Sequence, residues 1–126
     1  MKLSAKTDIE CLERIMKHIG SIKKAYTAFG IETLNDFLGS DVCQLAVSQA
    51  LTNVYELRKK LREETLAKMP NFQQIRLHAA RNIASHDYDS LDFEIIYRRV
   101  NQLLREEIHT EMEDALNELA NDKQGG

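Results

Sequence analysis

The chain has 126 residues, of which 43% are hydrophobic and 29% are charged, as in an ordinary globular protein. This length fits one domain and excludes a TIM barrel or a two-domain dehydrogenase. Seventeen Lys and Arg against twenty Asp and Glu give a net charge of −3, which argues against a protein that coats nucleic acid through general positive charge. The sequence shows no signal-peptide core and no apolar run of membrane-spanning length, so we expect a cytoplasmic protein.

Apolar residues recur every three or four positions in the first half of the chain, which is the helical period. No run alternates between apolar and polar residues as a half-buried strand would. Pro70 cannot sit in a helix interior and therefore sets a limit for the helix before it. The pattern predicts a helix over residues 7–29 ended by Gly30, a short helical turn over 33–38, and a long helix over 41–67 with Ser40 as its N-cap.

The second half of the chain continues the helical period. A third long helix is expected to start after Pro70 with Asn71 as its cap, to face inward with Phe72, Ile75, Ala79 and Ile83, and to fray near His86. Ser90 is the expected cap of the next helix. Its apolar stripe changes phase, which predicts a break between Leu104 and Glu106.

These elements predict an all-α protein built as an up-and-down antiparallel bundle of four helices, or five with the break. Residues 1–120 form the expected single domain, and residues 121–126 a frayed polar tail. Cys11 and Cys43 lie inside apolar runs, so both are expected to be reduced thiols in the core.

Most of the polar residues give no support to a cofactor or metal site. Glu106 and His109 form one Glu-x-x-His pair, whereas a di-iron bundle needs two such pairs and two further Glu residues. The sequence has no glycine-rich phosphate-binding loop. We therefore expect neither a metal nor a bound cofactor.

One cluster combines groups that can act on a phosphodiester. Arg81, Asn82, His86 and Tyr88 place a guanidinium, an amide, an imidazole and a phenol within about two helical turns. In a regular helix Arg81 and His86, five residues apart, diverge by roughly 140°, so their convergence needs an unwound helix end or a second copy of the motif. A purely structural interpretation stays open, in which Asn82 and His86 bond to each other at a helix end.

This segment resembles the Arg-x4-His signature of HEPN-domain ribonucleases, and Tyr88 completes the Arg-x4-His-x-Tyr form of HepT-type toxins. The resemblance covers residues 8–120. It implies a HEPN-like homodimer in which two copies of the motif meet in a cleft, and metal-independent cleavage of RNA. It also implies a partner, a small nucleotidyltransferase antitoxin that inactivates the toxin by adding AMP to Tyr88.

The residue types suit cleavage of RNA by its own 2′-hydroxyl. His86 is the expected general base or acid, Arg81 the stabiliser of the phosphorane, and Asn82 a residue that orients His86 or donates to the phosphate. The alternatives are a non-catalytic HEPN subunit that docks on a nucleotidyltransferase, and a plain helical dimer. Two basic runs, residues 58–62 and Arg98-Arg99, are either RNA contacts or solvated surface.

Overall fold

The computed structural model describes residues 4–125, except for residues 79–90. This part of the chain is helical, with no strand. Its helices are α1 (Ala5–Phe29), α2 (Leu34–Leu38), α3 (Asp41–Arg58), α4 (Glu63–Leu66), α5 (Pro70–Gln74), α6 (Phe93–Leu103) and α7 (Glu106–Gly125). The predicted all-α class is therefore confirmed, with more and shorter helices than expected.

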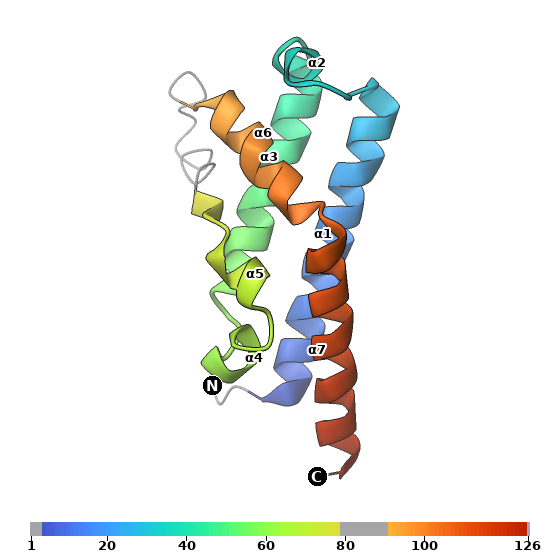
Figure 1. Ribbon diagram of the computed structural model, residues 1–126, viewed down its shortest axis with the longest axis vertical. Helices are drawn as coiled ribbons and strands as arrows, with labels where there is room; N and C mark the ends of the chain where they lie inside the picture. Colours follow the sequence, from blue (N-terminus) through green and yellow to red (C-terminus); the bar gives the residue numbers. More distant parts are fainter. Residues whose placement is uncertain (1–3, 79–90, 126) are drawn as a thin grey trace.

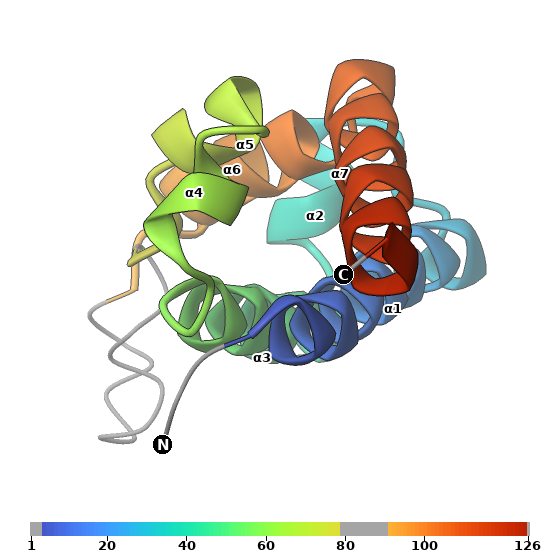
Figure 2. The ribbon, with the colours of Figure 1, turned by 90° about the horizontal axis from the view of Figure 1, so that it is seen from below.

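The three long helices form the frame of the molecule. α1 and α3 lie side by side and antiparallel, joined at one end by α2 (Figure 1). α7 packs along α1 in the opposite direction, and α4, α5 and α6 cover the side facing α3 (Figure 2). α6 crosses the three long helices obliquely (Figure 1). The arrangement is therefore not a simple up-and-down bundle, although α3 and α7 both run antiparallel to α1.

The first two elements form as the sequence predicts. Ser4 caps α1 by accepting a hydrogen bond from the Thr7 amide, and Gly30 ends α1 with φ of 65°. This left-handed conformation is one that glycine adopts without steric cost. In α2 the side chains of Thr33 and Asp36 form a reciprocal capping box, which explains how so short a helix is stable.

α3 ends at Arg58, nine residues before the end expected from the sequence, so the prediction of one helix over 41–67 is wrong there. The chain turns at Lys59–Leu61 and continues as the short α4. No glycine or proline marks this turn. Tertiary contacts stabilise it, because the side chains of Arg58 and Arg62, on either side, bind groups far away in the sequence.

Arg62 binds Asp8, a fully buried carboxylate of α1. The Arg62 Nε donates to Asp8 Oδ2 over 2.7 Å, its backbone amide donates to Oδ1 over 3.3 Å, and the Thr65 hydroxyl donates to Oδ2 as well. A buried carboxylate needs such donors, since an unpaired one is costly. These bonds fix α4 against the start of α1.

The apolar core runs the length of α1, α3 and α7. Fully or almost fully buried side chains include Leu12, Ile15, Ile22, Leu51, Val54, Ile96, Val100, Ile108 and Met112. Cys11 and Cys43 are buried free cysteines, as predicted, and burial raises the pKa of both thiols. The predicted break after α6 is confirmed at Leu104–Arg105, where it lets the buried stripes of α6 and α7 both face the core.

Three other sequence predictions concern the ends of helices. Asn71 is not a cap, because α5 starts at Pro70 with Met69 in the N-cap position. α6 is capped by Asp92, not by Ser90, which lies outside the described residues. The backbone of α7 is helical through Gly125, a span that includes most of the expected polar tail.

Candidate functional site

The four motif residues Arg81, Asn82, His86 and Tyr88 lie in residues 79–90, outside the described part of the chain. The structure does describe the chain on both sides of them. Buried side chains stand close to each boundary: Leu77 is 1% exposed on the entering side, and Leu91 is 9% exposed on the leaving side. The packing of these flanks therefore determines where the motif segment starts and ends.

The entering side begins with α5, whose N-terminus is bound by a carboxylate from α7. Glu111 accepts hydrogen bonds from the amides of Asn71 and Phe72, both over 3.0 Å, and from the Asn71 side-chain amide over 2.9 Å. The first amides of a helix have no partner within it, and a negative charge there also interacts favourably with the helix dipole. Glu111 thus takes the role that the sequence analysis gave to Asn71.

Arg58 of α3 binds the opposite end of α5. Its Nη1 donates to the carbonyl oxygens of Phe72 and Ile75, each over 2.8 Å. Its guanidinium also lies 5.3 Å from the centre of the Phe72 ring, within cation–π range. Burial lowers the pKa of Arg58, yet a guanidinium keeps its charge in proteins, so these bonds remain charge-assisted.

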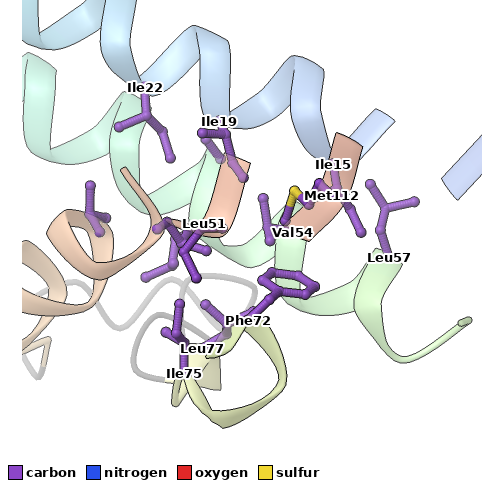
Figure 3. Close-up of a cluster of buried hydrophobic side chains, with 14 of the residues drawn as sticks. Ile15, Ile19, Ile22, Leu51, Val54, Leu57, Phe72, Ile75, Leu77 and Met112 are labelled. Carbon is purple, nitrogen blue, oxygen red and sulfur yellow. The ribbon is translucent and has the colours of Figure 1, made fainter. Parts of the chain in front are cut away.

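The helix expected to continue from α5 toward His86 stops instead at Gln74, so that prediction is wrong at Ile75. Ile75 is extended, with φ of −68° and ψ of 127°. The chain then enters a 3₁₀ turn at Leu77 and His78, and Ile75 and Leu77 are both buried. Figure 3 shows Phe72, Ile75 and Leu77 facing Leu51 and Val54 of α3. The carbonyl bond from Arg58 and this burial together outweigh the local preference for helix.

The leaving side starts at α6, which Asp92 caps by accepting from the amides of Glu94 and Ile95. Aromatic rings then fix α6 against α1 and α2: Tyr97 lies 6.1 Å from Tyr26 and 5.4 Å from Phe37, centre to centre. Pairs at such distances stabilise beyond their buried area. Burial raises the pKa of the Tyr26 phenol, so it stays protonated here.

Three cations of the basic run over residues 58–62 have partners within the protein. Arg58 binds backbone carbonyls, Arg62 binds Asp8, and Lys59 pairs with Glu56 over 3.0 Å. The sequence showed the charge but not the buried acceptors, which come from segments more than a dozen residues away. The residues that sequence reasoning missed are therefore Arg58 and Glu111, which bind the two ends of α5.

His109, which belongs to the single Glu-x-x-His pair of the sequence, has a partner on its own helix. His109 lies in an ion-pair contact with Glu113, one turn further along α7. Within the described ranges, no group of three or more His, Cys, Asp or Glu side chains is arranged to hold a metal ion. None of the helices seen in those ranges is both long and apolar enough to cross a bilayer.

Comparison with known families gives a match over residues 9–119, nearly the whole chain, to the family described as ribonuclease HepT-like. The chain belongs to the HepT-like ribonuclease family. The matched region contains the motif positions as well as both flanks described above. Comparison with curated proteins and with solved structures gave no match. For this HepT-like chain the family therefore supplies the class of activity, a ribonuclease, and the structure supplies the environment of the motif segment.

Proposed function

We propose that this HepT-like protein is the toxin of a toxin–antitoxin system and acts as a metal-independent endoribonuclease. The observation that carries the proposal is the family match over residues 9–119, because the Arg-x4-His-x-Tyr motif of the sequence falls inside it. Arg81 and His86 are the catalytic residues, and Asn82 assists them.

The chemistry is attack of a ribose 2′-oxygen on the adjacent phosphorus. The bond from phosphorus to the 5′-oxygen breaks, which leaves a 2′,3′-cyclic phosphate on one fragment and a 5′-hydroxyl on the other. An imidazole near its ordinary pKa can take the proton from the 2′-hydroxyl or give one to the leaving oxygen. The Arg81 guanidinium can bind two oxygens of the charged phosphorane at once. These groups suffice without a metal ion.

The active form is a homodimer in which both copies contribute to one cleft. In a regular helix Arg81 and His86 point in different directions, so pairing Arg81 of one protomer with His86 of the other satisfies both roles. Light scattering on the purified protein tests this proposal. A dimer mass is expected at micromolar concentration, and a monomer that still cleaves RNA would contradict it.

Regulation comes from a small nucleotidyltransferase antitoxin that transfers AMP to Tyr88. The Tyr88 oxygen attacks the α-phosphorus of ATP, pyrophosphate leaves, and the phenol loses its proton. The phosphodiester formed places a negative charge two residues from His86, where it competes with RNA for the guanidinium.

The central experiment is cleavage of a labelled RNA in the presence of EDTA. The wild-type protein is expected to produce 2′,3′-cyclic phosphate ends. Arg81→Ala and His86→Ala are each expected to lose about two to four orders of magnitude in rate. The matched control is His78→Ala, since His78 is an exposed imidazole just before the motif segment, and it should retain full activity.

Equal cleavage by wild type and His86→Ala would overturn the catalytic assignment. The same result would favour the alternative, a non-catalytic HEPN subunit that docks on a nucleotidyltransferase. Loss of the activity in EDTA, with recovery on adding a divalent cation, would overturn metal independence. Circular dichroism on each variant separates loss of chemistry from loss of fold.

A further inference from the structure

A groove of about 430 Å³ runs beside α6, between Leu34 and Arg105. Three arginines line it, Arg98, Arg99 and Arg105, together with Tyr97 and Gln102. A second pocket of about 170 Å³ shares Gln102 and Arg105 with it and reaches Asn71 and Gln74 of α5. The two pockets therefore adjoin each other at Gln102 and Arg105.

The groove is locally basic in an acidic protein. Arg98 lies 3.7 Å from Glu94, and Arg105 lies 3.6 Å from Glu107, in pairs whose members are all more than half exposed. Exposed pairs of this kind contribute little stability, so both guanidinium groups can turn to another anion. Arg99 has no carboxylate within ion-pair distance among the described residues.

Two buried polar atoms in the groove lack hydrogen-bond partners in the described structure. They are Nε of Arg99, a donor, and Oε1 of Gln102, an acceptor. Residues three apart on a helix lie on the same face, so the Arg99 and Gln102 side chains lie on the same side of α6. Leaving such groups unpaired when buried costs free energy. The rest of both side chains lines the groove, so an anionic ligand there would meet the other guanidinium nitrogens of Arg99 and the amide nitrogen of Gln102.

We propose that this groove binds the sugar–phosphate backbone of single-stranded RNA outside the catalytic motif. Phosphate oxygens accept from Arg99, Arg98 and Arg105, and a ribose 2′-hydroxyl, which can donate as well as accept, bonds to Gln102. Arg99 lies six residues into α6, about 9 Å from its start, and α6 begins five residues after Tyr88. The groove is therefore close in the sequence to the proposed catalytic residues. The choice of RNA as the polyanion rests on the proposed ribonuclease function.

Binding of a fluorescein-labelled RNA 12-mer tests the groove, in a His86→Ala background that prevents cleavage. Arg99→Gln and Arg105→Gln are each expected to raise Kd by about three- to tenfold. Each should also reduce the dependence of log Kd on log salt by about 0.7, the value for one phosphate contact on a single strand. The matched control is Arg14→Gln, which removes the same charge from an exposed position on α1 and should change neither quantity.

The proposal is overturned if Arg99→Gln and Arg105→Gln bind this RNA with the Kd and salt dependence of the Arg14→Gln control. Gln102→Met removes the amide with little change of shape, so it is expected to weaken binding of RNA more than of DNA with the same sequence. Equal affinity of the parent protein for RNA and DNA would overturn the contact with the 2′-hydroxyl. Thermal unfolding of each variant excludes a folding defect as the cause.

The same samples separate this proposal from the function on which it rests. If the wild-type protein cleaves RNA but the groove variants bind RNA as tightly as the parent does, the groove proposal is refuted. The ribonuclease function then still stands. A wild-type protein that cleaves nothing, while Arg99→Gln loses binding, supports the groove and refutes the catalytic function.

Discussion

Arg58 Nη1 lies 2.8 Å from the carbonyl oxygen of Ile75, six residues before Arg81, the first residue of the Arg-x4-His motif. The same nitrogen binds the carbonyl of Phe72. One side chain of α3 therefore determines where α5 ends and in which direction the chain leaves it. This contact therefore holds the last described stretch of chain before the motif.

Arg58→Met retains much of the apolar stem but leaves the Ile75 carbonyl without its donor, and the Phe72 carbonyl with only the Ile75 amide. We expect the free energy of unfolding to fall by about 2–4 kcal/mol, because hydrogen bonds from charged groups are strong and unpaired buried acceptors are costly. Urea denaturation followed by circular dichroism measures this loss. Lys59→Met is the matched control, since Lys59 is exposed, and it should stay within about 0.5 kcal/mol of wild type. Equal losses in the two variants would contradict the role of Arg58.

Asp8→Ala removes the buried carboxylate that receives the Arg62 and Thr65 bonds. Breaking a buried pair from one side costs about 3–5 kcal/mol, and the partial exposure of Arg62 reduces this to about 2–4 kcal/mol. The measurement is again urea denaturation. Glu10→Gln, at an exposed position on the same helix, should have almost no effect. A stability of Asp8→Ala within 0.5 kcal/mol of wild type would show that the bonds of Asp8 contribute little.

The Thr33 and Asp36 capping box predicts a dependence of stability on pH. The backbone amides of Glu32 and then Thr33 hold the pKa of Asp36 below its ordinary value of 3.8. A carboxylate whose pKa is lower in the folded state stabilises the fold above the unfolded pKa, and this contribution is lost as the pH falls through the folded pKa. Asp36→Asn should therefore have a lower Tm than wild type at pH 7, and the difference should shrink below about pH 4. A difference in Tm that persists unchanged at pH 2.5 would contradict this linkage.

Local signals in the sequence account for the elements that were predicted well. Gly30, the short helical turn over residues 33–38 and the change of stripe before Glu106 each depend on neighbouring residues, so periodicity and capping rules identify them. The ends of α3 and α5 depend on Arg58, Asp8 and Glu111, whose partners lie far along the chain. No rule of spacing connects Glu111 to Asn71, and a turn without glycine or proline has no marker in the sequence.

The candidate site likewise combines features that the sequence reveals with features that only the structure reveals. The motif was predicted from its resemblance to the Arg-x4-His signature of HEPN-domain ribonucleases, because its residue types and spacing alone left a purely structural interpretation open. The groove beside α6 was visible only as two adjacent arginines. What distinguishes Arg99 from Arg62 is the presence of a buried carboxylate beside the second and not the first, and that difference arises from the packing of helices.

The regulatory role proposed for Tyr88 can be tested separately from the proposed catalysis. Tyr88→Phe retains the ring and removes only the oxygen that would attack ATP, so the variant should fold and keep most of its ribonuclease activity. It should nevertheless resist inactivation by the nucleotidyltransferase antitoxin. Intact-mass analysis after co-expression with that enzyme is expected to show the mass of one AMP or more on the wild-type protein and none on Tyr88→Phe, since phosphoryl transfer requires the hydroxyl nucleophile. Tyr55→Phe, which removes a hydroxyl from α3, serves as the control and should carry the same adduct as wild type. An adduct on Tyr88→Phe would place the modification elsewhere, and a Tyr88→Phe protein as inactive toward RNA as His86→Ala would make the phenol part of the catalytic machinery instead.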